Sequence, residues 1–187
     1  LVAPDELNGD LLLMESRTSV RRITCHLLEQ GRTLPGFIGD ISYAQSNRER
    51  YEGFCQALAD AGKKVDSSLC LTTPLGIDTY REEIDTFLSS LSRMPDAFVC
   101  ASDYVACILM QLLEKRGLRV PEDVAVSGFD NNTEDLLAEH LTTVQVFNEE
   151  LGARLALQIL YRIKYPNTPH EITYLGTNVL YRDSTGD

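Results

Sequence analysis

Two charged residues, Arg50 and Asp130, have the chemistry and the positions to hold a small polar molecule. Arg50 lies about one turn into a predicted helix, where its guanidinium can fork onto two oxygens of a sugar or carboxylate. Asp130 ends a predicted strand, where a carboxylate can accept two vicinal hydroxyls, or serve as a general base or metal ligand. Each also has a plainer explanation. Arg50 can pair in solvent with Glu49 or Glu52, and Asp130 can form an Asx-turn or helix cap.

Catalytic chemistry has less support. Asp103 stands where many α/β enzymes carry a nucleophilic or metal-binding aspartate, but no lysine, histidine or second carboxylate accompanies it. Capping of the following helix by Ser102 or Asp103 explains its position more simply. The chain has no G-x-G-x-x-G, no Walker loop and no G-x-S-x-G elbow. We therefore predict no enzyme, no nucleotide phosphate site and no cofactor.

The metal-binding residue types are scattered along the chain. The five cysteines form no C-x-x-C pair, and the three histidines are far apart. Neither a metal site nor a disulfide framework is expected, because both need closer or paired ligands. Free cysteines in apolar surroundings behave as small hydrophobic residues, which favours a reducing cytoplasm.

Charge and hydropathy exclude further classes. The 187 residues carry a net charge of −11, which repels phosphate backbones and anionic lipid. The apolar fraction of 43% is typical of a globular protein with a core. No apolar run is long enough to span a bilayer, and no secretory signal precedes the first strand. We expect no membrane partner.

The apolar pattern alternates short runs with amphipathic stretches, as in βαβ units. Strands are expected at 11–14, 36–39, 65–71, 96–101, 124–129, 142–146, 172–175 and 179–181. Helices are expected at 18–30, 47–61, 78–91, 103–116, 134–139 and 148–163. This order predicts an α/β fold with doubly wound parallel sheets, whose ligands bind beyond the carboxyl ends of the strands.

Several short motifs occur together in one order. The runs are R-Y-E-G-F-C-Q-A-L (50–58), P-D-A (95–97), D-Y-V-A (103–106), G-L-R-V-P-E-D-V-A-V-S-G-F-D (117–130), L-T-T-V (141–144), L-G (151–152) and R-D-S-T (182–185). Together they resemble the effector-binding domain of the LacI family of bacterial transcription regulators, which shares its fold with periplasmic sugar-binding proteins. The resemblance implies a two-lobed, type I periplasmic-binding-protein-like domain with part of the first lobe missing.

The resemblance also implies which residues bind the effector. The arginine of R-x-x-G-F and the aspartate of G-F-D hold the small molecule in the family, and these positions are Arg50 and Asp130. Tyr43, Ser46 and Ser102 follow strands that end at the same edge, so we expect them to line the same site. The family often has Asn where this chain has Ser102, so a single, shorter hydroxyl stands here in place of an amide.

The same resemblance divides the chain into four segments. Residues 1–40 are expected to end the N-terminal lobe, and residues 41–143 to form the C-terminal lobe. Residues 144–165 are expected to return to pack on the N-terminal lobe, and residues 166–187 to supply final strands of the C-terminal lobe.

The predicted function is sensing of a sugar or related metabolite by a cytoplasmic, DNA-binding regulator. The alternative is a transport-type periplasmic sugar-binding protein of the same fold, which would need an export signal. The regulator is expected to be a homodimer, and helix 103–116 is apolar on more than one side, which fits a partner or the core of its own lobe equally well.

DNA contact is expected only through a helix-turn-helix N-terminal to this chain. Arg17, Arg21 and Arg22 form the one local concentration of positive charge, and a solvated helix face explains it better than DNA binding.

Overall fold

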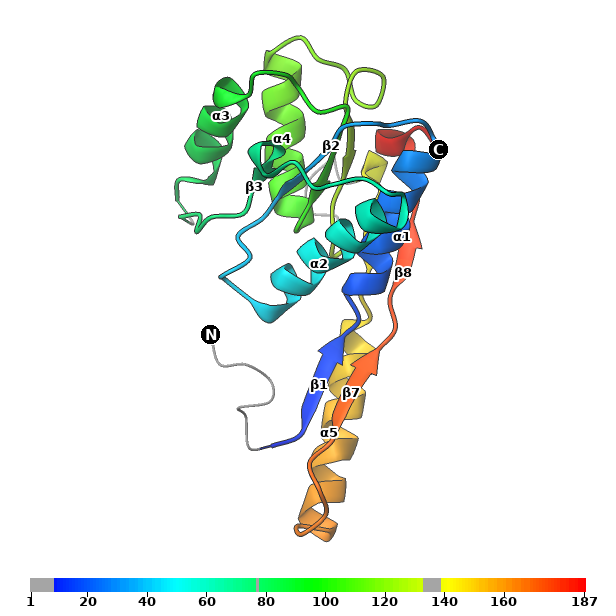
Figure 1. Cartoon of the computed structure of the whole chain (residues 1–187). Coiled ribbons are helices and arrows are strands. Elements are labelled where there is room, and N and C mark those ends of the chain that lie inside the picture. Colours follow the sequence, from blue (N-terminus) through cyan, green and yellow to red (C-terminus); the bar gives the residue numbers. More distant parts are fainter. Residues whose placement is uncertain (1–8, 77, 133–138) are drawn as a thin grey trace.

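A four-stranded parallel sheet forms the centre of the molecule. The computed structural model describes residues 9–76, 78–132 and 139–187. The sheet has the order β3-β2-β4-β5, with strands β2 (Pro35–Ile38), β3 (Cys70–Leu71), β4 (Ala97–Cys100) and β5 (Ala125–Ser127). Phe37 pairs with Cys70 on one side and Val99 on the other. The carboxyl ends of β2, β4 and β5 therefore meet at one edge of the sheet (Figure 1).

Helices cover both faces of this sheet. They are α1 (Arg17–Glu29), α2 (Gln45–Asp60), α3 (Tyr80–Ser90) and α4 (Asp103–Lys115). Side chains alternate along β4, so Val99 packs with α1 and α2 while Phe98 and Cys100 pack with α3 and α4. Two buried cores result, one on each face of the sheet. The predicted doubly wound α/β class is confirmed.

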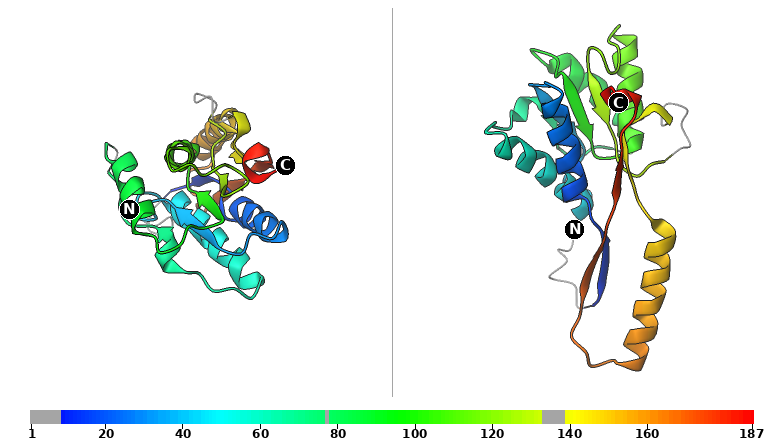
Figure 2. Two further views of the ribbon diagram at one scale, coloured as in Figure 1. Left: turned by 90° about the horizontal axis from the view of Figure 1, so that it is seen from above. Right: turned by 90° about the vertical axis from the view of Figure 1, so that its right-hand side faces the viewer.

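A narrow extension leaves the sheet lobe on the side away from α3 and α4. It contains β1 (Leu11–Met14), β7 (Ile172–Leu175) and α5 (Asn148–Lys164), with β1 and β7 paired in parallel (Figures 1 and 2). Two strands, β6 (Thr143–Gln145) and antiparallel β8 (Asn178–Leu180), connect it to the lobe. Asp10 joins its parts, because its carboxylate accepts from Arg162, Gln158 and the amide of Glu171.

The extension has no buried helix of its own. No side chain of α5 is buried, and Leu160 and Ile163 are 63% and 73% exposed. A two-stranded ribbon with one helix is too small to bury an apolar face. The sheet lobe therefore has a buried core, whereas the extension leaves an apolar helix face exposed.

The strands expected at 65–71 and 124–129 are shortened most, for local reasons. The strand expected at 65–71 is reduced to β3, because Asp66 accepts from the amide of Ser68 and caps a 3-10 turn there. The strand expected at 124–129 ends at Ser127, and left-handed backbone follows at Asp130 and Asn131, with φ of 109° and 51°. The helix expected at 134–139 lies almost wholly outside the described residues.

The expected lobe boundary at residue 40 does not coincide with a change of packing. β2 pairs with β4, and α1 packs against α2, so residues 17–38 share the core of the sheet lobe. By packing, the change falls after Met14, where the chain leaves β1. The reason is that Val20, Ile23 and other apolar residues of α1 face this sheet.

Helix α4 is buried within this lobe. Leu109 and Leu113 lie in the same core as Ile84 of α3 and Phe98 of β4. The lobe's own packing thus accounts for the second apolar side of the helix, whereas Tyr104 is 59% exposed. In the described residues, no helix has the length and hydropathy needed to cross a membrane.

Candidate functional site

Helix α2 brings Arg50 to the carboxyl edge of the sheet. The helix begins directly after the loop that follows β2, and Asp40 shapes this loop by accepting from the amides of Ser42 and Tyr43. Gly53, three residues further along the helix, lets α2 lie close to α1. A Cβ atom at Gly53 would stand 2.2 Å from the carbonyl oxygen of Arg17. The glycine of the R-x-x-G-F motif is therefore a packing requirement.

Arg50 is 7% exposed and its guanidinium is held on three sides. Nη1 donates to the carbonyl oxygen of Ala101, and Nη2 lies 3.3 Å from Oδ1 of Asp130. The guanidinium carbon lies 3.6 Å from the centroid of the Phe129 ring. Nε is buried with no hydrogen-bond partner among the described residues. Burial lowers the pKa of Arg50, and the carboxylate of Asp130 opposes that change.

Asp130 presents a carboxylate that is only partly used. Its side chain is 40% exposed and Oδ1 faces Arg50. No hydrogen bond within the described part of the chain occupies Oδ2. Burial raises the pKa of Asp130, and the nearby Arg50 opposes the rise. One carboxylate oxygen thus remains able to accept from hydroxyl groups of a ligand.

The other predicted residues are near this edge but are not joined to the pair. Ser102 caps α4, where its Oγ accepts from the amide of Val105 at 3.3 Å. Its hydroxyl hydrogen remains a potential donor to a ligand. Tyr43 is 67% exposed, and Ser46 lies half-buried in the first turn of α2. Within the described residues, no hydrogen bond links Tyr43 or Ser46 to Arg50 or Asp130.

The structure adds residues that sequence reasoning did not assign to the site. Asn131 donates from Nδ2 to Oε1 of Gln145 at 2.5 Å and accepts from Arg182 at 2.8 Å. The Phe129 ring lies against the guanidinium of Arg50, and the hydroxyl of Thr143 accepts from the amide of Asn131. The run D-N-N at residues 130–132 was the available signal, since Asp and Asn tolerate left-handed backbone. Their partners on β6 and the C-terminal segment could not be read from spacing.

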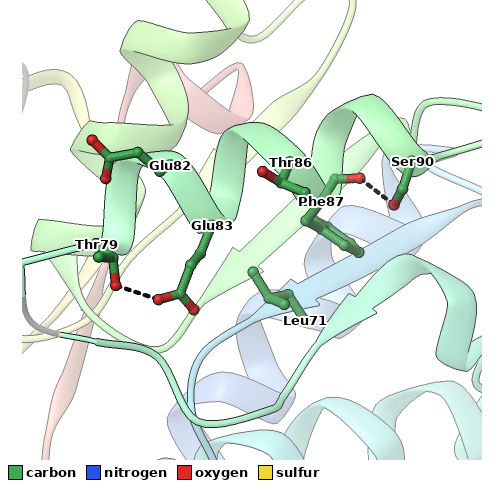
Figure 3. A pocket seen from close by; sticks show the side chains of 7 residues that line it. All are labelled: Leu71, Thr79, Glu82, Glu83, Thr86, Phe87 and Ser90. Carbon is green, nitrogen blue, oxygen red and sulfur yellow. Dashed lines mark hydrogen bonds between the residues drawn. The ribbon is translucent and has the colours of Figure 1, made fainter.

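The open pocket beside α3 is separate from this pair. Its volume is about 560 Å³, and its lining includes Leu71, Phe87 and Thr86 (Figure 3). Two of its hydroxyl groups are already engaged, because Thr79 donates to Glu83 and Ser90 donates to the carbonyl oxygen of Phe87. We assign it no ligand.

Metal binding and a cationic surface find no support in the described residues. No group of three or more cysteine, histidine or carboxylate side chains is placed to hold a metal within them. All five cysteines are free thiols. Arg17 and Arg21 are paired with Glu52 and Asp60 on the neighbouring helix, so their charge is largely neutralised.

Comparison with known proteins identifies the family. Residues 24–185 match the family described as a periplasmic binding protein-like domain. The HTH-type transcriptional regulator DegA of Bacillus subtilis is 35% identical over 130 residues, which cover 68% of this chain and 38% of that protein. The HTH-type transcriptional repressor PurR of Photobacterium profundum is 28% identical over 166 residues, which cover 88% and 49%.

Solved structures agree with these relatives. A complex of the transcriptional regulator CelR with cellobiose superposes with a TM-score of 0.85 at 28% identity, covering 96% of this chain and 55% of that one. A putative LacI-family regulator from Sanguibacter keddieii gives 0.83 at 26% identity, covering 100% and 69%. The chain spans about half the length or less of the curated relatives named above. The resemblance inferred from the motifs is confirmed: the chain belongs to the family of periplasmic binding protein-like domains, in the form found in LacI-type transcriptional regulators.

Proposed function

We propose that this chain senses a sugar or related polyhydroxylated metabolite for a bacterial DNA-binding transcriptional regulator. The observation that carries the proposal is the buried Arg50 held against Asp130, whose second carboxylate oxygen accepts no hydrogen bond from the residues that the structure describes. A buried guanidinium paired with a partly exposed carboxylate that has spare hydrogen-bonding capacity is costly for folding alone, which favours a binding role.

The polarity of the site favours hydroxyl groups over charged ligands. Asp130 supplies an acceptor, Ser102 supplies a donor, and the guanidinium of Arg50 is already paired. A vicinal diol presents two neighbouring hydroxyl groups, each of which can donate to Asp130 or accept from Ser102. Tyr43 offers an exposed ring that can pack on a sugar face. The relative CelR was solved with cellobiose, which agrees with this chemistry.

The extension is proposed to belong to a first lobe that the rest of the protein completes. β1, β7 and α5 expose an apolar surface that a few additional strands and helices would cover. The effector would then bind between two lobes and favour the arrangement that it contacts better. We propose a cytoplasmic homodimer, with DNA bound by a helix-turn-helix outside this chain and with no catalytic activity.

A binding experiment on the intact protein tests the proposal. Thermal shift would first screen monosaccharides, disaccharides including cellobiose, and nucleobases, and calorimetry would measure the ligand that stabilises most. Loss of a charge-assisted hydrogen bond costs about 1.5 to 3 kcal/mol, so Asp130→Ala and Arg50→Ala should each weaken binding roughly tenfold to a hundredfold.

Asp123→Ala is the matched control. Asp123 also pairs with an arginine, Arg119, but on the exposed surface far from the carboxyl edge of the sheet. It should leave affinity unchanged. Unchanged affinity in both site variants would overturn the assignment of Arg50 and Asp130.

A further inference from the structure

Asp103 is a buried carboxylate that the proposed effector site does not use. It is 2% exposed and begins helix α4, but its carboxylate does not cap that helix, because Ser102 does so. Instead Oδ1 accepts from the hydroxyl of Thr143 at 2.6 Å, and Oδ2 accepts from the amide of Asn132 at 2.7 Å. Both partners lie outside its own helix. The capping explanation for Asp103 is therefore wrong.

The residues that Asp103 contacts enclose the turn that carries Asp130. Asp130 and Asn131 both have positive φ, a backbone conformation that costs free energy for residues other than glycine. The hydroxyl of Thr143 accepts from the amide of Asn131 at 3.2 Å while donating to Asp103. One carboxylate thus holds two consecutive amides at the end of the left-handed turn, that of Asn131 through Thr143 and that of Asn132 directly.

The same contacts join the turn to strand β6, which leads into the extension. The amide of Asp130 donates to the carbonyl oxygen of Val144 at 3.1 Å. Gly128 leaves room for this arrangement, since a Cβ atom there would stand 2.2 Å from Oδ1 of Asp103. The close approach requires a residue without a side chain at that position.

We propose that Asp103 is a positioning residue, which holds the strained turn so that Asp130 faces Arg50 and which fixes that turn to strand β6. The role of Arg50 and Asp130 in binding a ligand rests on the proposed function. The mechanical role of Asp103 rests only on the contacts above. A carboxylate accepts from both partners, whereas an amide in its place offers one acceptor and one donor, so one of the two hydrogen bonds is lost or reversed.

Hydrogen exchange on the intact protein, without ligand, tests this role. In Asp103→Asn, the amides of residues 130–132 should exchange about tenfold faster or more, as expected when a local contact of more than about 1.4 kcal/mol is lost. Thr143→Val should have the same effect, and Thr143→Ser should restore protection because it keeps the hydroxyl. These two variants keep the test valid if Asp103→Asn folds poorly.

Asp96→Asn is the matched control. Asp96 clamps a loop at the opposite end of β4, where it accepts from the amides of Thr33 and Leu34. It should speed exchange at residues 33 and 34 and leave residues 130–132 as in the wild type. Wild-type exchange at 130–132 in both Asp103→Asn and Thr143→Val would overturn the proposal.

Calorimetry separates this inference from the proposed function, with cellobiose or the sugar found by the screen as the probe. Asp130→Ala should weaken binding roughly tenfold to a hundredfold while the amides of residues 131 and 132 stay protected. If Asp130→Ala binds normally, the proposed function fails, but the exchange result for Asp103 still decides the mechanical role. If Asp130→Ala loses binding and Asp103→Asn binds as the wild type does, Asp103 does not position the effector carboxylate.

Discussion

The guanidinium carbon of Arg50 lies 3.6 Å from the centroid of the Phe129 ring. Since Phe129 directly precedes Asp130, one turn supplies both the ring beneath the guanidinium and the carboxylate beside it. A cation over an aromatic face in a desolvated setting is stabilised by about 2 kcal/mol. The planar contact therefore fixes the guanidinium in one plane, with one nitrogen on the Ala101 carbonyl oxygen and another on Asp130.

This geometry predicts that lysine cannot replace Arg50. An ammonium group is a point donor that cannot stack on Phe129 and reach both Ala101 and Asp130 at once. Arg50→Lys should weaken effector binding roughly tenfold or more, measured by calorimetry on the intact protein. Arg119→Lys, at an arginine that is 69% exposed beside Asp123, should bind as the wild type does. Equal affinities for the two variants would contradict the role assigned to the planar group.

The burial of Asp103 predicts a specific pH dependence of stability. Burial raises the pKa of Asp103 to about 6, with Asp130 adding to the rise and Thr143, Asn132 and Arg182 opposing it. Arg50 also faces Asp103 and stabilises its ionised form. Between about pH 4 and 6 the folded protein binds more protons at this group than the unfolded chain does. The contribution of Asp103 to the free energy of unfolding therefore falls as pH rises through this window.

Asp103→Asn removes that titration. The difference in free energy of unfolding between wild type and Asp103→Asn should decrease by about 2 to 3 kcal/mol from pH 4 to pH 7. Urea denaturation at intervals across this range measures it. Asp96→Asn serves as the comparison, because Asp96 lies at the opposite end of the sheet. A difference that stays constant with pH would show that Asp103 titrates as an exposed aspartate does.

How much the sequence predicts depends on the range of the interactions involved. The helices and the parallel strands follow from apolar periodicity, and α2 begins and ends within two residues of its expected bounds. β3 was overestimated because Val65 and its neighbours have strand propensity, whereas Asp66 and Ser68 form a local capped turn. The capped turn formed by Asp66 and Ser68 therefore outweighed the strand propensity of residues 65–71.

The site was predictable only in part for the same reason. Arg50 and Asp130 belong to recognisable motifs, and the structure brings them together. The contacts of Asp103 with Thr143 and of Asn131 with Gln145 join segments whose relative position depends on how the chain crosses between β5 and β6. No local pattern encodes that crossing. The expected boundary at residue 40 failed to match the packing because the amphipathic pattern of α1 does not state which sheet it covers.

Gly53 should be intolerant of any side chain. Its close approach to Arg17 involves a backbone carbonyl, which cannot rotate away as a flexible side chain would. Gly53→Ala should lower the free energy of unfolding by about 1 to 3 kcal/mol, as overpacking in a core does. Gly176→Ala is the control, since no atom lies within 4 Å of a Cβ built there. Thermal or urea denaturation of both variants measures the change in the free energy of unfolding. Equal stability of the two variants would mean that α1 and α2 can move apart at no cost in free energy.

The apolar face of α5 predicts how the 187-residue chain behaves alone. Leu157, Leu160 and Ile163 are each more than half exposed, and they lie on an extension that has no core. A contiguous apolar patch of this kind drives association in water. The isolated chain should therefore self-associate at micromolar concentration in analytical ultracentrifugation and bind a hydrophobic dye. Leu160→Lys with Ile163→Lys should reduce both self-association and dye binding, whereas Thr86→Lys with Ser90→Lys, which add the same charge on α3, should not.

In the intact protein, Leu160→Lys with Ile163→Lys should instead destabilise the fold. We propose that the remainder of the first lobe covers this face of α5, so the two ammonium groups would be buried there. A monodisperse, dye-free monomer of the isolated chain would show that the extension needs no further cover, and would remove the structural reason for a missing part of that lobe.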